Sequence, residues 1–138
     1  MCRSQVGILE AVAELLADGQ LRSVYDEVRV STVLNVLEDA EHLLSKGYLA
    51  AAMGLGGGAL ETHLREMCAS RPAITISGHG MISKYVDALY AEKAVDGPTY
   101  KQLTAWGGAR NDAAHDPANY APLAKVVELH LTGIRHSI

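Results

Sequence analysis

The 138-residue sequence has no phenylalanine, a single tryptophan and no excess of basic residues. It has 12 lysines and arginines and 16 aspartates and glutamates, so the formal net charge is −4. An acidic chain is a poor candidate for broad binding to nucleic acid, because the affinity of such binding comes from basic side chains on phosphates. The shortage of aromatic rings also argues against a base-stacking platform. Any contact with nucleic acid is therefore expected to be local.

Other absences bear on where the protein is found. No apolar run reaches the roughly 20 residues that span a bilayer. Glu10 and Glu14 interrupt the basic-then-apolar pattern that a secretion signal needs. The two cysteines, Cys2 and Cys68, lack metal-ligand spacing and are too few for a disulfide framework. These features predict a cytoplasmic protein in a reducing environment, with no membrane partner.

What the sequence does contain is helical periodicity. Apolar residues recur at steps of three and four along most of the chain. The stripe that begins with Leu21, Val24 or Tyr25 and Val28 is imperfect, because the next step, to Val33, is five residues. "AITI", residues 73–76, is the only strand candidate and is too short to build a sheet. We therefore predict an all-α fold, an up-and-down bundle of about five to six helices, as one domain over residues 1–138. The expected helices cover about 4–17, 21–45, 48–69, 81–93, 98–116 and 120–134.

A glycine-rich stretch, "MGLGGGALE" at residues 53–61, invites comparison with phosphate-binding loops. It lacks the GK[ST] ending of a P-loop and the preceding strand of a dinucleotide fold. Glycine destabilises a helix by roughly 1 kcal/mol relative to alanine, and it is tolerated where another helix approaches closely. Close helix packing is thus favoured over ligand binding. The small-residue surface is expected from Ala51, Ala52, Gly54, Gly57, Gly58 and Ala59.

The stretch with chemical potential is "WGGARNDAAHD", residues 106–116. Arg110 supplies a permanently charged fork that fits a phosphate. His115 can accept or donate a proton near neutral pH. Together the two side chains suit the cleavage of RNA, where the 2′-hydroxyl is an internal nucleophile and neither a metal nor a protein nucleophile is required. A plainer alternative is that both residues are solvated charges at a helix end.

The spacing of the pair is a difficulty. Positions five apart on an ideal helix point about 140° apart, so Arg110 and His115 do not share one face. The long reach of arginine and a helix end near His115 relieve this in part. A second copy across a two-fold axis would bring two arginines and two histidines to one cleft and supply both an acid and a base.

At these residues the sequence resembles the HEPN domain family, whose hallmark is an arginine, a polar residue directly after it, and a histidine after four to six residues. "RNDAAH" has this form, with Asn111 as the polar residue. Upstream, "GYLAAAMGLGGGALETHLREM" is similar to the small-residue helix of the family, with Leu-Glu ending at Glu61 and Leu-Arg ending at Arg65. The resemblance covers residues 47 to 116 well and the preceding helices only by pattern.

The resemblance implies a homodimeric helical bundle in which paired motifs line a cleft between protomers. Many members with an intact motif are metal-independent ribonucleases that act as toxins or in defence against phage. Arg110 and His115 would then be catalytic, and Asn111 would shape the site or contact phosphate. Glu61 would orient the arginine or histidine, or simply pair with Arg65 at i, i+4. RNA is the expected substrate, an antitoxin protein is a candidate partner, and neither a cofactor nor a metal is expected.

The sequence departs from the family where some toxins have a tyrosine two residues after the histidine, as the acceptor of modification by an antitoxin. Here that position is Pro117, and the nearest tyrosine is Tyr120. Asp112 and Asp116 also place negative charge beside the expected phosphate site. Two alternatives to an endoribonuclease therefore stay open. One is a non-catalytic HEPN-like module that binds RNA, a nucleotide or a protein, and the other is a structural helical dimer.

Overall fold

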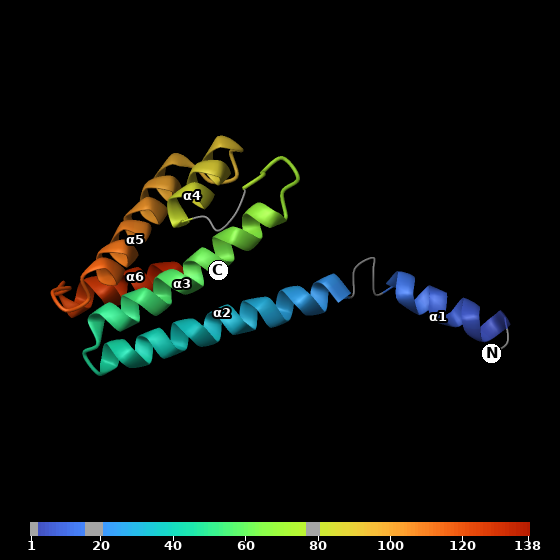
Figure 1. Cartoon of the computed structure of the whole chain (residues 1–138), viewed down its shortest axis with the longest axis horizontal. Coiled ribbons are helices and arrows are strands. Elements are labelled where there is room, and N and C mark those ends of the chain that lie inside the picture. The colour runs from blue at the N-terminus through green and yellow to red at the C-terminus, as the bar shows by residue number, and fades with distance from the viewer. Residues whose placement is uncertain (1–2, 16–20, 77–80) are drawn as a thin grey trace. The chain divides into compact units, whose positions relative to one another are not determined.

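A computed structural model describes residues 3–15, 21–76 and 81–138, and in this part of the chain the only regular elements are six helices (Figure 1). The predictions of an all-helical fold and of five to six helices are confirmed. The strand candidate at residues 73–76 is irregular. The helices are α1 (Arg3–Leu15), α2 (Leu21–Ser45), α3 (Leu49–Ala69), α4 (Ile82–Ala91), α5 (Gly97–His115) and α6 (Ala124–Ser137).

The chain divides into two compact units, Met1–Thr32 and Val33–Ile138. The first unit holds α1 and the beginning of α2. Among its described apolar side chains, Ile8, Leu9, Val24, Tyr25 and Val28 are all more than half accessible to solvent, and Val30 is partly buried. The second unit holds the rest of α2 and the four following helices. The prediction of a single domain over residues 1–138 stays a prediction.

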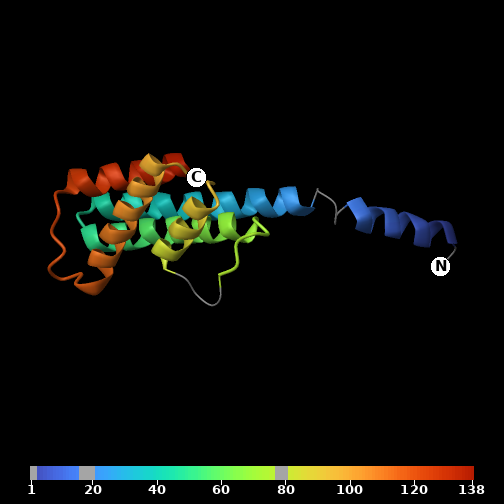
Figure 2. The ribbon, with the colours of Figure 1, turned by 90° about the horizontal axis from the view of Figure 1, so that it is seen from above.

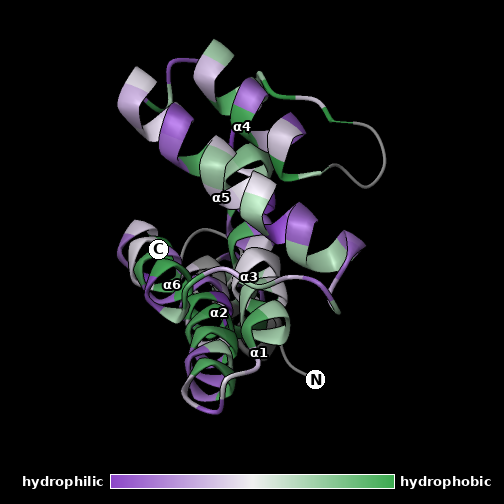
Figure 3. Cartoon of the chain, turned by 90° about the vertical axis from the view of Figure 1, so that its left-hand side faces the viewer, coloured by the Kyte–Doolittle hydropathy of each residue, from purple (hydrophilic) through white to green (hydrophobic). Residues whose placement is uncertain are grey.

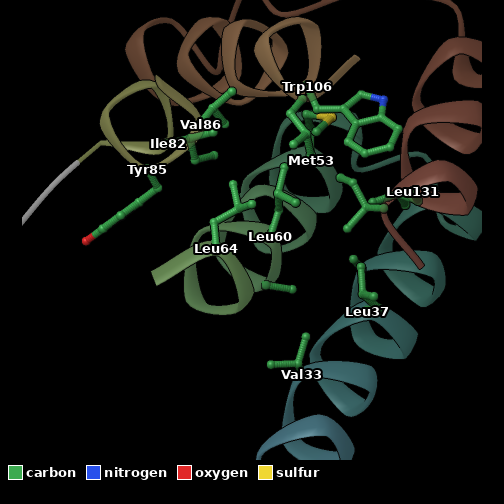
Figure 4. Close-up of a cluster of buried hydrophobic side chains, with 14 of the residues drawn as sticks. Val33, Leu37, Met53, Leu60, Leu64, Ile82, Tyr85, Val86, Trp106 and Leu131 are labelled. Carbon is green, nitrogen blue, oxygen red and sulfur yellow. The ribbon is translucent and has the colours of Figure 1, made fainter. Parts of the chain in front are cut away.

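The hydrophobic core belongs to the second unit. Within that unit α3 contacts α4, α5 and α6, and α4 also contacts α5. The two views of the ribbon show α4 and α5 side by side, and both cross α3 at an angle (Figures 1 and 2). The buried cluster includes Met53, Leu60 and Leu64 of α3, Trp106 of α5 and Leu131 of α6 (Figure 4). The helix α3 is therefore the central element of this unit.

Helix ends follow from local chemistry. Lys46-Gly47 in the sequence predicts the end of a helix. Gly47 has a φ of +84°, a left-handed conformation that glycine adopts without steric cost, and it lies in the turn directly after α2. At the other end of the bundle, Asp96 caps α5 by accepting a hydrogen bond from the Thr99 backbone N–H at 2.8 Å. This hydrogen bond to the carboxylate lowers the pKa of Asp96. Pro98 occupies the first turn, where it is tolerated.

Two parts of the predicted apolar pattern are wrong. The stripe of α2 is buried only from Val33 onwards, whereas Val24, Tyr25 and Val28 are exposed. The five-residue step between Val28 and Val33 is where the buried face begins. In the predicted helix 120–134 the spacing of Leu123, Val127 and Leu131 predicts that all three face inward, but Leu123 is 76% exposed because it precedes the first residue of α6 as its N-cap. In the predicted helix 81–93 the apolar spacing predicts one inward face that includes Tyr85 and Leu89, and both are buried in α4.

The glycine run of α3 lies within the bundle, and its packing role is confirmed for part of its length. Ala52, Gly57 and Ala59 are buried, whereas a Cβ atom added at Gly54 or Gly58 would have no neighbour within 4 Å. One face of the run is thus covered by other helices and the opposite face is not.

Hydrophobic and hydrophilic segments alternate along α4 and α5, as expected of helices that bury one face (Figure 3). No helix in the described ranges is long and apolar enough to cross a membrane.

Candidate functional site

The motif "RNDAAH" occupies the last turns of α5. His115 is the final helical residue, and Asp116 is the C-cap, with its backbone N–H donating to the Asp112 carbonyl oxygen at 3.3 Å. The Asp116 carboxylate in turn accepts a hydrogen bond from the Asn119 side chain at 2.9 Å. The expected helix end before Pro117 is therefore correct. It places His115 at a helix terminus, where the chain turns away and leaves the imidazole exposed.

Arg110 lies on the same helix but in a different environment. Its side chain is 34% exposed, and its Nη2 atom lies 3.3 Å from Oε2 of Glu61 on α3. The aliphatic part of the side chain rests on Gly57, one turn before Glu61 on the same face of α3. Arg110 is thus supported along its length by α3, while part of its guanidinium remains accessible to solvent.

Glu61 connects two arginines. Its side chain is 20% exposed, and its other carboxylate oxygen lies 4.0 Å from Nη2 of Arg65. Both expected arrangements of Glu61, toward the motif arginine and toward Arg65 at i, i+4, are therefore present at once. Two positive charges share one negative charge, so the group formed by Arg110, Glu61 and Arg65 is positive by itself, while the acidic Asp112 follows Arg110 on α5. A local positive site of this kind can attract a phosphate.

The remaining motif residues are separate from this ion-pair cluster. The ion pairs of Arg110 and Glu61 involve neither Asn111 nor His115. Asn111 and Asp112 are exposed. The Tyr120 hydroxyl has a raised pKa, first because the side chain is partly buried and second because the Asp112 charge is near. Tyr120 thus packs against the core beside the motif instead of pointing freely into solvent.

The structure brings together Arg110 and Glu61 but not Arg110 and His115. The sequence spacing anticipated this separation. What sequence reasoning missed is the contact of Arg110 with Gly57. A signal for it was present, because Gly57, Glu61 and Arg65 follow one another at four-residue steps and so lie along one edge of α3.

Other candidate features are located elsewhere. Among the described residues, no group of three or more His, Cys, Asp or Glu side chains is placed to hold a metal ion. A pocket of about 420 Å³ lies between the end of α3, the following loop and α4, with Cys68 and Tyr85 in its wall. Burial raises the pKa of the Cys68 thiol, as expected of an unreactive core cysteine. Cys2 lies outside the described residues, as does His79 in the glycine-flanked stretch "GHG" before α4.

Comparisons with family models, with curated proteins and with solved structures found no match for this chain. Its function must therefore be argued from the site itself.

Proposed function

We propose that the protein is a metal-independent endoribonuclease of the HEPN type, with a composite site between two copies of the chain. The observation that carries the proposal is the state of the motif arginine. Arg110 is fixed by Glu61 and Gly57, yet it keeps a third of its surface open, a short way along α5 from an exposed His115. A side chain held in place but still accessible is what electrostatic stabilisation of a transition state needs.

The chemistry is a transesterification within the RNA. The 2′-hydroxyl oxygen attacks the adjacent phosphorus as its proton passes to a histidine base. The bond from phosphorus to the 5′-oxygen breaks, and a second proton donor protonates that oxygen. The products are a 2′,3′-cyclic phosphate and a 5′-hydroxyl. Arg110 would neutralise the charge that develops on the non-bridging phosphate oxygens.

This scheme requires a homodimer, because one copy of the chain offers a single motif histidine and the reaction needs both a base and an acid. Facing copies of α5 would supply two imidazoles, one as base and one as acid, and two guanidinium groups to one phosphate. Asn111, exposed beside Arg110, would contact phosphate or shape the cleft. In a cytoplasmic setting such an activity suits a toxin or a phage-defence effector, and an antitoxin protein is the corresponding candidate partner.

The test is incubation of the purified protein with RNA in EDTA, in parallel with His115→Ala. The proposal predicts cleavage by the parent, none of an all-DNA strand, and loss of RNA cleavage in the variant. Cleavage at the parental rate by His115→Ala would contradict it.

The dimer is tested by unfolding equal amounts of the parent and His115→Ala together and refolding the mixture. If one shared site needs the imidazoles of both copies, only parent homodimers cleave RNA, so the mixture keeps about a quarter of the activity of the same total amount of parent protein. About half the parental activity, as expected when each copy acts alone, would contradict a shared site.

A second candidate is a non-catalytic module that binds RNA. The Glu61 carboxylate, which already occupies part of the Arg110 guanidinium, and the acidic Asp112 and Asp116 nearby weaken the charge stabilisation that catalysis requires, and this favours a function without turnover. Binding of RNA that survives in both Arg110→Ala and His115→Ala, without cleavage by the parent, would identify this function.

A further inference from the structure

Gly57 stands out among the glycines of α3 because of what lies against it. A Cβ atom placed on Gly57 would lie 2.6 Å from Cβ of Arg110 and 3.3 Å from its Cδ, and it would overlap Cγ between them. Real side chains do not approach one another so closely. Any residue other than glycine at position 57 therefore conflicts with the stem of Arg110 as it stands.

The conflict at Gly57 is harder to relieve than a similar one next to it. At Gly56 an added Cβ would overlap Cδ2 of Leu131, a terminal methyl group whose position changes when the side chain rotates. At Gly57 one of the atoms met is Cβ of Arg110, whose position is set by the backbone of α5. That helix is anchored nearby by the buried Trp106. A methyl group at position 57 must therefore displace α5 or push Arg110 off α3.

Gly57 and Glu61 act on the two ends of the same side chain. They are four residues apart on α3 and so lie one above the other on one face. The stem of Arg110 crosses the helix at Gly57, and its guanidinium reaches Glu61 at 3.3 Å. The direction of the guanidinium is thus fixed by two features of α3: the absence of a side chain at Gly57, against which the aliphatic part of Arg110 packs, and the carboxylate of Glu61.

We infer that Gly57 is a positioning residue for Arg110. It leaves the space that lets the arginine lie flat on α3, reach Glu61 and present its remaining N–H donors to a phosphate. The functional consequence rests on the proposed ribonuclease activity, whereas the positioning itself is a property of the fold and can be measured without RNA.

The first experiment measures positioning through thermal unfolding of four proteins: the parent, Gly57→Ala, Arg110→Gly and the double variant. Overpacking predicts that Gly57→Ala lowers the unfolding temperature of the parent by about 5 °C. In the Arg110→Gly background the same change should cause no loss, because the atoms that the new methyl group would meet are gone. An equal loss in both backgrounds would overturn the inference.

A matched control is available on the same helix. Gly58→Ala places a methyl group where nothing lies within 4 Å, so it should keep or raise the unfolding temperature through better helix propensity. A fall as large as that of Gly57→Ala would show that α3 resists alanine generally, and it would overturn the specific role of Gly57.

The second experiment measures RNA cleavage at a temperature at which circular dichroism shows all variants folded. Gly57→Ala should reduce kcat at least about tenfold, as expected when a charged group is misplaced, and Gly58→Ala should stay near the parental value. If the parent cleaves RNA and Gly57→Ala cleaves it equally fast, the positioning role is overturned while the proposed function stands. If the parent does not cleave RNA, the proposed function fails and the unfolding measurements alone decide the inference.

Discussion

Two arginines of the helical bundle pair with glutamates on neighbouring helices, and they are held differently. Arg135 of α6 grips Glu41 of α2 with two nearly parallel hydrogen bonds of 2.9 and 3.1 Å. Arg110 of α5 meets Glu61 of α3 through one nitrogen, at 3.3 Å. The Arg135 guanidinium donates two hydrogen bonds to one carboxylate, so this pair joins α6 to α2. The Arg110 guanidinium keeps donors free for another anion. The same residue types can therefore hold a fold together in one place and offer a binding group in another.

The largest expected difference between the two pairs is in catalysis. Arg110→Ala should slow RNA cleavage by about a hundredfold or more, because it removes charge stabilisation of the transition state. Arg135→Ala, which deletes the same side chain in the other pair, should cleave within about threefold of the parental rate. The measurement is the initial rate on a short RNA in EDTA. Equal losses in the two variants would show that the arginines do not differ in function.

For the free energy of unfolding the order should be the opposite, with the larger loss in the Arg135 variant. Arg135→Ala should lower the free energy of unfolding by about 1 kcal/mol, because a two-pronged pair joining α2 to α6 is lost from a partly exposed site. Arg110→Ala should cost less, since its single, longer contact is weaker. Urea unfolding of both variants checks this order. A larger loss in Arg110→Ala would mean that Arg110 is mainly structural.

The two ends of α5 offer a related contrast. Asp96 caps the end opposite to the motif, so Asp96→Ala should lower the unfolding temperature by a few degrees and leave RNA cleavage unchanged. The hydrogen bond from Thr99 lowers the pKa of Asp96 below its ordinary value of 3.8. The stabilisation is therefore present above that value and is lost as the pH falls through the folded-state pKa. Unfolding temperatures of parent and variant should converge in acid, and a constant gap across the acid range would exclude Asp96 as the titrating cap.

The smallest expected effect is a difference in RNA affinity between variants of the two paired glutamates, Glu61 and Glu41. Glu61→Gln keeps an oxygen that can accept from Arg110 but removes the negative charge that competes with phosphate, so RNA should bind about threefold more tightly at low salt. Glu41→Gln should leave RNA affinity unchanged. The measurement is the RNA affinity from fluorescence anisotropy. The strand is RNA with 2′-O-methyl groups, which cannot be cleaved because the 2′-hydroxyl is blocked. Weaker binding by Glu61→Gln would show that Glu61 orients Arg110 more than it competes with phosphate.

Much of the fold could be predicted from local signals in the sequence. Apolar residues at helical spacing located the helices, and Gly47, Pro98 and Pro117 located several of their ends because these residues restrict or permit particular backbone angles. The apolar pattern failed for Val24 and Val28, because periodicity shows that a helix has an apolar face and does not show whether another element covers it.

The site was predictable to a smaller extent. The motif itself could be read from the order of residues along α5. The contact of Arg110 with Gly57 and Glu61 joins residues about fifty positions apart, and it depends on how α5 crosses α3. No local pattern specifies such a crossing, although the four-residue step from Gly57 to Glu61 marks the edge of α3 on which it occurs.

If Arg110 and His115 cleave RNA by activating its own 2′-hydroxyl, the new ends of the RNA carry the chemical signature of that reaction. These ends are identified by mass spectrometry of the fragments from a defined RNA incubated in EDTA with the parent and with His115→Ala. Fragments that end in a 2′,3′-cyclic phosphate and begin with a 5′-hydroxyl are expected from the parent alone. Intact RNA in both samples, or the same fragments in both, would contradict it.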